Sequence, residues 1–154
     1  MEDTVEKDCI MVRVYPVIPG KLFVSARTAT MTPQEKVDTI ERNGIIAVIN
    51  LWHTPDDDIR KICKAYSHHP LADGRNINDN LVKAAVKQVL SHLRLRQTVL
   101  VHCYGGRNRS GLVCCLAMIE YLQISGSKAI ELFTAARPNS LVNQHFRNYL
   151  VKIR

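Results

Sequence analysis

One cysteine and one arginine in the middle of the chain are spaced as a phosphate-binding loop requires. Cys103 and Arg109 are separated by five residues, which include Gly105 and Gly106. Such a loop can curl so that its backbone N–H groups point inward, while a guanidinium binds two oxygens of the same anion. Those dipoles, the start of the following helix and the arginine all favour a thiolate over a thiol. The spacing therefore predicts a nucleophilic cysteine at the floor of this loop.

The other cysteines do not indicate a metal centre or a disulfide framework. Cys114 and Cys115 fall in an apolar segment, where a cysteine is usually a packing residue. The chain has five cysteines, an odd number without a Cys-x-x-Cys pair. We therefore expect no metal, no cofactor and a reducing, intracellular location in the cytoplasm, with the nucleus as an alternative.

Length and composition predict one globular domain. The chain has 154 residues, of which 46% are hydrophobic, and a net charge of +7 that attracts polyanions without specificity. We expect an N-terminal extension over 1–15 and the domain over 16–154. The N-terminus is acidic and lacks the apolar core of a signal peptide, and the longest apolar run, Leu112 to Ile119, is too short to cross a bilayer.

The pattern along the chain favours an α/β fold. Short apolar segments alternate with helical ones, which predicts a mostly parallel sheet of four to five strands flanked by helices. Strands are expected at 22–24, 45–51, 65–69 and 98–101. Helices are expected from Pro33 to before Gly44, at 80–95, 110–122 and 127–136, and around Phe146 to Ile153. The loop of Cys103 then lies between a strand and a buried helix, at the sheet edge where such folds bind ligands.

The segment His102-Cys103-x-x-Gly106-x-x-Arg109-Ser110 resembles the signature of the cysteine-dependent protein phosphatases. The likeness covers most of the chain, from Pro19-Gly20-Lys21-Leu22 to a closing pattern of Arg137-Pro138 and Asn143-x-x-Phe146-x-x-x-Leu150, which is similar to the atypical dual-specificity branch. The chain is too short for the larger tyrosine-specific domains. The resemblance implies hydrolysis of phosphomonoesters, with phosphotyrosine, phosphoserine and phosphothreonine proteins as the first-ranked substrates.

The resemblance also implies a role for each residue of the signature. Cys103 would attack phosphorus while Arg109 and the loop N–H groups hold three oxygens, and the Ser110 hydroxyl would stabilise the departing thiolate. His102 is expected to order the loop through hydrogen bonds. The expected substrate-binding residues are Tyr104, Gly105, Gly106, Arg107, Asn108 and Arg109.

Expulsion of an alkoxide or phenoxide also requires a proton donor near the leaving oxygen. Asp73 precedes Cys103 by 30 residues and adjoins Gly74, so it resembles the family's general acid in position and context. The alternative is a solvated turn aspartate. The aspartates at 56–58 and Asp79 are poorer candidates, since the first three follow a strand and Asp79 lies at a helix start. Asn143 is expected either to support the loop or to cap the last helix only.

Two positions in the loop leave the substrate class open. Arg107 stands where phosphoinositide phosphatases carry a lysine, and Asn108 resembles the loop of RNA 5′-triphosphatases. RNA 5′-phosphates therefore rank second and phosphoinositides third. A module that binds phosphate without turnover is a further alternative, although it would need neither a nucleophile nor an acid.

Overall fold

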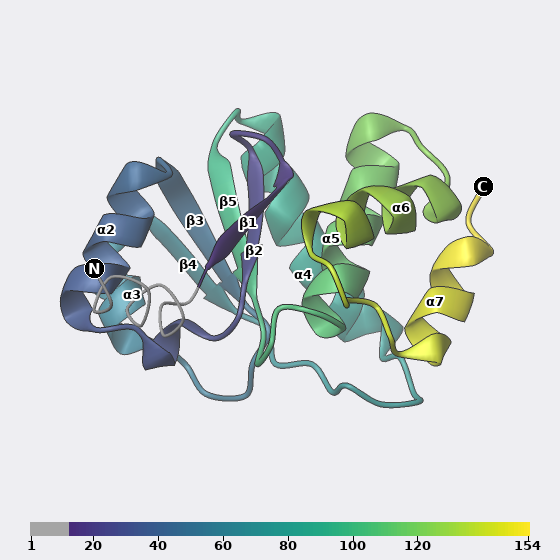
Figure 1. Cartoon of the computed structure of the whole chain (residues 1–154), viewed down its shortest axis with the longest axis horizontal. Helices are drawn as coiled ribbons and strands as arrows, with labels where there is room; N and C mark the ends of the chain where they lie inside the picture. The colour runs from purple at the N-terminus through teal and green to yellow at the C-terminus, as the bar shows by residue number, and fades with distance from the viewer. Residues whose placement is uncertain (1–12) are drawn as a thin grey trace, which may run out of the picture.

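The centre of the protein is a five-stranded sheet, seen in a computed structural model that describes residues 13–154 (Figure 1). The strands are β1 (Val14–Ile18), β2 (Leu22–Ser25), β3 (Ile45–Asn50), β4 (Ala65–His68) and β5 (Thr98–His102), in the order β1-β2-β5-β3-β4. Four of them, β2 to β5, run parallel, and β1 is antiparallel to β2. The predicted α/β fold with a mostly parallel sheet is confirmed.

Helices cover both faces of the sheet (Figure 1). One side carries α2 (Pro33–Arg42) and α3 (Asp57–Ile62), and the other carries α4 (Asp79–Arg94), α5 (Arg109–Leu122), α6 (Gly126–Ala136) and α7 (Gln144–Val151). A short 3-10 turn, η1 (Thr28–Thr30), follows β2. Alternate strand residues face the two layers. Val24 and Val101 belong to the larger core beside α4 and α5, whereas Phe23 and Leu100 belong to the smaller core beside α2 and α3.

The sequence signals account for most of these elements. Thr32 and Glu35 form a capping box at the start of α2, and Pro33 occupies its first position. The expected strands correspond to β2, β3, β4 and β5, and the expected helices correspond to α2, α4, α5, α6 and α7. Strands β3 and β5 are buried along most of their length, which explains why their sequences are continuously apolar.

Three elements were not expected: β1, η1 and α3. Val14 and Tyr15, assigned above to the extension over 1–15, belong to β1 and pair with Ser25 and Val24, so the domain starts earlier than predicted. Pro16 lies within this strand, opposite Phe23, and has no backbone N–H, which an edge strand tolerates. A proline argues against a strand in the sequence, which is why β1 was not predicted. Residues 1–12 of the predicted extension lie outside the described residues.

A buried ion pair joins α2 to α3. Lys36 Nζ lies 2.9 Å from Asp56 Oδ1, and the Thr28 hydroxyl donates to Asp56 Oδ2 at 2.5 Å. Asp56 also caps α3 by accepting the N–H of Ile59. Burial opposes the charge on Asp56, but the hydrogen bonds from Thr28 and Lys36 outweigh it and lower the pKa of the carboxyl. This pair anchors the segment that follows β2 and explains Asp56 without a catalytic role.

Candidate active site

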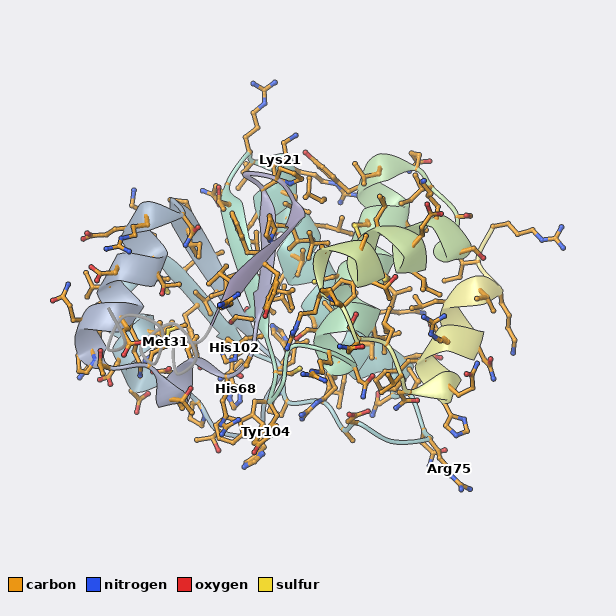
Figure 2. All side chains as sticks on the ribbon, in the orientation of Figure 1. Lys21, Met31, His68, Arg75, His102 and Tyr104 are labelled. Carbon is orange, nitrogen blue, oxygen red and sulfur yellow. The ribbon has the colours of Figure 1, made fainter. Side chains whose placement is uncertain are left out.

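The loop that carries Cys103 connects β5 to α5 at the carboxyl edge of the sheet. Its strand is the central one, and His102 at the end of that strand pairs in register with Ser25 on β2 and Asn50 on β3. Figure 2 shows His102 near the end of the sheet and Tyr104 beyond it. The first two turns of α5 are buried except for Arg109, so the loop is braced from behind. The predicted placement between a strand and a buried helix is confirmed.

Cys103 lies at the floor of the loop and is 2% exposed. The N–H of Gly106 donates to Cys103 Sγ across an N···S distance of 3.2 Å. Gly106 has a φ of +69°, and a Cβ at this position would overlap the carbonyl oxygen of Ser25. Glycine alone adopts this conformation freely and allows this close approach. Gly106 therefore directs a backbone dipole at the sulfur.

Arg109 begins α5 and reaches the segment that carries Asp73. Its Nη1 donates to the carbonyl of Leu71 at 3.2 Å. Its Nε is buried and has no hydrogen-bond partner among residues 13–154. A guanidinium has five N–H donors in one plane, so this contact leaves donors free to bind an oxyanion. The side chain is thus placed to link the two loops and to bind a phosphoryl group.

The carboxylate of Asp73 lies beside the phosphate loop and is held by two asparagine amides. Asp73 Oδ2 accepts from Asn108 Nδ2 at 3.0 Å, and Oδ1 accepts from Asn143 Nδ2 at 2.8 Å. The backbone N–H of Asn143 donates to Asn108 Oδ1 at 3.1 Å, so the three side chains form one connected group. Asn143 Nδ2 also donates to the carbonyl of Gly74. The structure therefore brings Asp73 and the phosphate loop together.

Asn143 caps the last helix and contacts the loop of Asp73, and its support of the phosphate loop stays a prediction. Its Oδ1 accepts the N–H groups of His145 and Phe146 and caps α7, while its Nδ2 supports the loop of Asp73. Asn108, expected to bind substrate, uses both ends of its amide within the protein. Among the other expected substrate-binding residues, Tyr104 and Arg107 have exposed side chains. Their roles in substrate binding stay predictions.

His102 and Ser110 are buried on either side of Cys103. Neither ring nitrogen of His102 makes a hydrogen bond of good geometry within residues 13–154, so the predicted ordering of the loop by this ring is not seen. The N–H of Leu51 donates to the His102 carbonyl at 2.7 Å and ties the end of β5 to the segment after β3. Burial lowers the pKa of His102 from 6.5 to about 4, which keeps the ring neutral at pH 7. Ser110 Oγ makes no hydrogen bond to Cys103 Sγ, and its role stays a prediction.

Two arginines that the sequence reasoning did not select also hold the loop. Arg137 Nη2 donates to the carbonyl of Gly105 at 3.0 Å. The backbone N–H of Arg27 donates to the carbonyl of Tyr104 at 3.0 Å, and its guanidinium lies 3.9 Å from the centre of the Tyr104 ring. Arg137 had one signal, its place before Pro138 at the end of a helix. Nothing in the pattern around Arg27 indicated its contact with the loop.

This constellation of buried cysteine, arginine and carboxylate lies within a known domain. The family model "Dual specificity phosphatase, catalytic domain" matches residues 28–154. The chain belongs to this dual specificity phosphatase family. The match includes the phosphate loop, Asp73 and the closing helices, and it agrees with the resemblance seen in the signature around Cys103.

Individual relatives are more distant. Cyclin-dependent kinase inhibitor 3 of Mus musculus is 30% identical over 88 residues, which are 56% of this chain and 42% of the mouse protein. The chain thus aligns with less than half the length of this curated relative. Among solved structures, Tk-PTP in its active form has a TM-score of 0.75 at 20% identity, covering 90% of this chain and 93% of that one. Human DUSP28 has a TM-score of 0.74 at 22% identity, covering 90% of each chain. At these identities the two structures support the fold.

Proposed function

We propose that this domain hydrolyses phosphomonoesters of phosphotyrosine, phosphoserine and phosphothreonine proteins through a cysteinyl-phosphate intermediate. One observation carries the proposal: the Cys103 sulfur lies at the floor of a loop whose Gly106 N–H points at it, with Arg109 and Asp73 beside the same loop. A module that only binds phosphate needs the arginine. It needs neither a thiol at the floor nor a carboxylate held at the rim.

In the first step, the Cys103 thiolate attacks phosphorus in line with the leaving oxygen. The phosphorus–oxygen bond breaks, and its electron pair goes to the leaving oxygen, which takes a proton from Asp73. The free N–H donors of Arg109 and the loop amides bind the three remaining phosphoryl oxygens as their charge develops. The product is an alcohol or phenol, and the phosphoryl group stays on sulfur.

In the second step, water attacks the cysteinyl phosphate and gives a proton to the Asp73 carboxylate. The phosphorus–sulfur bond breaks, and the electron pair returns to Cys103 as a thiolate, which the Ser110 hydroxyl can stabilise. Inorganic phosphate leaves, and Asp73 is protonated again for the next turnover. Side chains and loop amides of the protein, together with water, supply every group in this scheme, so the proposed reaction uses no metal or cofactor.

Phosphoproteins remain ahead of RNA 5′-phosphates and phosphoinositides as the proposed substrates. The resemblance to RNA 5′-triphosphatases rested on Asn108, and the contacts of its amide with Asp73 and Asn143 give this residue a function that does not involve RNA. The resemblance to phosphoinositide phosphatases rests on Arg107 alone. Neither alternative gains a supporting observation.

A reducing compartment, the cytoplasm or the nucleus, is the proposed location of this activity. The cysteines at 63, 103, 114 and 115 are free thiols, which suits such an environment. Within residues 13–154, no helix is both long and apolar enough to cross a membrane.

Para-nitrophenyl phosphate tests the proposed chemistry directly. The wild-type protein should turn it over, Cys103→Ser should not, and rapid acid quenching of the wild type should trap one phosphoryl group on the Cys103 peptide. Cys63→Ser, which removes a half-buried thiol outside the loop, is the matched control and should keep full activity. Tight binding of inorganic phosphate with no turnover would instead identify a binding module.

Phosphopeptides, 5′-triphosphorylated RNA and phosphoinositides, assayed with the wild type and Cys103→Ser, then test the substrate class. The proposal expects the highest kcat/KM on phosphopeptides, including those that carry phosphoserine or phosphothreonine. A higher kcat/KM on RNA or lipid would overturn the proposed substrate while leaving the chemistry intact.

A further inference from the structure

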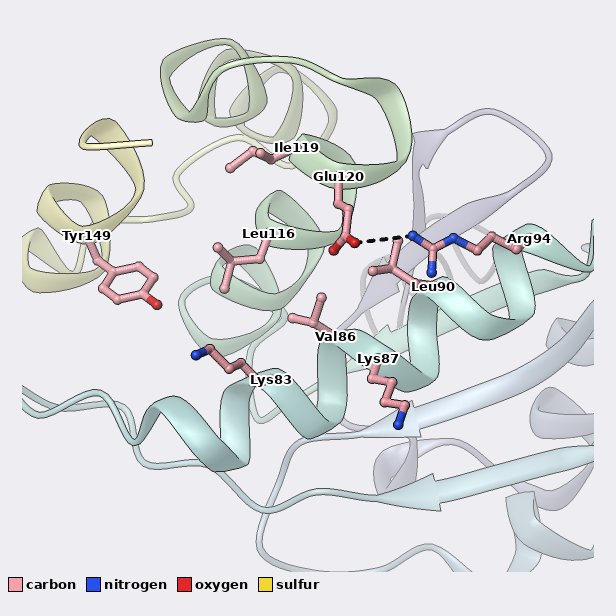
Figure 3. A pocket seen from close by; sticks show the side chains of 9 residues that line it. All are labelled: Lys83, Val86, Lys87, Leu90, Arg94, Leu116, Ile119, Glu120 and Tyr149. Carbon is pink, nitrogen blue, oxygen red and sulfur yellow. Dashed lines mark hydrogen bonds and ion pairs between the residues drawn. The ribbon is translucent and has the colours of Figure 1, made fainter. Parts of the chain in front are cut away.

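We propose that the groove between α4, α5 and α7 docks an acidic amphipathic helix of the phosphoprotein substrate. The inference rests on the proposed function, because the docked helix belongs to the molecule that the active site dephosphorylates. The groove has a volume of about 550 Å³, and Figure 3 shows its lining side chains from the three helices. None of these side chains belongs to the candidate active site.

The floor of the groove is apolar. Val86 and Leu90 of α4 are buried there, and Leu116 and Ile119 of α5 are half-buried beside them. The two helices pack against each other along this line, so their side chains form a furrow rather than a flat surface (Figure 3). An apolar furrow between helices is the geometry that receives one face of an amphipathic helix.

The rim of the groove is positively charged. Lys83 and Lys87 lie one turn apart on α4, are exposed, and form no ion pair with any of the described residues. Arg94 is already paired with Glu120 at 3.2 Å. Of the three cations that line the groove, the two lysines are therefore available to pair with acidic groups of a bound protein, and their apolar stems extend the furrow. A helix with leucines on one face and glutamates beside them complements both the floor and the rim.

One lining residue of the groove contacts the start of α4. Tyr149 lines the groove from α7, and its hydroxyl donates to Asp79 Oδ1 at 3.1 Å. Asp79 is the first residue of α4 and follows the loop that carries Asp73 by a few residues. A helix docked in the groove would tether the rest of its chain to the domain, which raises the effective concentration of a phosphoryl group on the same chain at the active site.

Two synthetic substrates test this docking site. One is a phosphotyrosine peptide, and the other is the same peptide joined by a Gly/Ser linker to a helix with leucines on one face and glutamates on the flanks. The extension should raise kcat/KM of the wild type by about tenfold, through a lower KM. Lys83→Glu/Lys87→Glu should abolish this gain, and an extension with serines in place of the leucines should give none.

Lys61→Glu/Lys64→Glu is the matched control, since it makes the same charge change at exposed positions on the α3 side of the sheet. It should keep most of the gain. Both double variants should hydrolyse para-nitrophenyl phosphate at the wild-type rate, which separates this test from failure of the proposed chemistry. The proposal is overturned if the extension gives no gain, or if both double variants lose it equally. Self-association that only Lys83→Glu/Lys87→Glu abolishes would assign the groove to a second copy and also overturn it.

Discussion

Cys103 and Asp73 reach the same site by different structural means. Cys103 is 2% exposed and lies between the central strand and a buried helix, so the core itself sets its position. Asp73 lies in an irregular, exposed segment between β4 and α4, and its carboxylate is held by the amides of Asn108 and Asn143. The nucleophile is thus part of the rigid fold, whereas the acid is attached to it by a few side-chain hydrogen bonds.

This difference suits the two tasks. A nucleophile and its oxyanion donors gain from fixed geometry, because they cost no reorganisation during the reaction. An acid loop must open so that product can leave, and segments with few buried contacts open most easily. Changes at the floor of the site should therefore impair every substrate or the fold. In the step that forms the cysteinyl phosphate, changes at the acid loop should impair only substrates that need a proton on the leaving group.

Among variants that keep Cys103, the largest loss is expected for Gly106→Ala. The added Cβ overlaps the Ser25 carbonyl and disfavours a φ of +69°, so the N–H that points at Cys103 must turn away. We expect kcat on para-nitrophenyl phosphate to fall about 10³-fold, the loss typical of removing a preorganised donor. Gly105→Ala is the control, because its Cβ would meet only side-chain atoms of Arg107 at 3.8 and 3.9 Å. Equal losses in both variants would contradict this account of the floor.

The buried ring of His102, next to Cys103 in the chain, should make the stability of the protein depend on pH. Burial lowers the pKa of His102 from 6.5 to about 4, so between these values the unfolded chain binds a proton that the folded protein does not. Stability must then fall as pH falls through this range, by about 3 kcal/mol in total.

Urea unfolding of the wild type and His102→Asn at several pH values measures this effect. The wild type should lose about 3 kcal/mol more than the variant between pH 7 and 4. His53→Asn removes an exposed histidine and should follow the wild type. Parallel curves for the wild type and His102→Asn would show that the buried ring does not set the pH dependence.

The acid loop provides the contrasting test. Asp73→Asn should lower kcat/KM about 10²-fold on an alkyl phosphate, whose leaving group needs a proton, and much less on para-nitrophenyl phosphate. The contrast is expected in kcat/KM because this constant covers only the steps up to the cysteinyl phosphate, before Asp73 acts as a base. Asp79→Asn, at the start of α4 and bonded to Tyr149, should change neither rate by more than about twofold. A loss that is equal on both substrates would mean that Asp73 supports the fold rather than donating a proton.

The sequence predicted those parts of the molecule that depend on local pattern. Strands β3 and β5 are continuous apolar runs, and the place of Cys103 and Arg109 in one loop between a strand and a helix follows from their spacing. Strand β1 was not predicted because it contains Pro16, and a proline argues against a strand. Helix α3 was not predicted because its acidic first turn, capped by Asp56, resembles a surface turn.

The contacts that hold the Asp73 loop against the phosphate loop could not be predicted from local sequence patterns. Asp73 was selected from its context, but its partners Asn108 and Asn143 lie 35 and 70 residues away in the chain. Arg137 similarly reaches Gly105 over 32 residues. Such pairings depend on how α7 and the loops pack, and a single sequence contains no periodic signal for them.

Asn108→Ser should have the smallest effect on the rate, and it tests the hydrogen bond between Asn108 and Asp73. Serine has a shorter side chain with a single polar atom, so it cannot reach both Asp73 and the Asn143 N–H as the separate nitrogen and oxygen of the Asn108 amide do. Hydrogen bonds to a charged group contribute about 1.5–3 kcal/mol, so a partial loss should lower kcat on an alkyl phosphate by about tenfold. The rate on para-nitrophenyl phosphate should stay close to that of the wild type.

A double-mutant cycle separates positioning of the acid from a direct contact with substrate. If Asn108 acts through Asp73, then adding Asn108→Ser to Asp73→Asn should cost almost nothing further. Asn76→Ser, which changes an exposed asparagine in the loop of Asp73, is the control and should leave the rate unchanged in both backgrounds. If the two losses multiply, Asn108 contacts the substrate directly, and the resemblance to the RNA 5′-triphosphatase loop would again support RNA as a substrate.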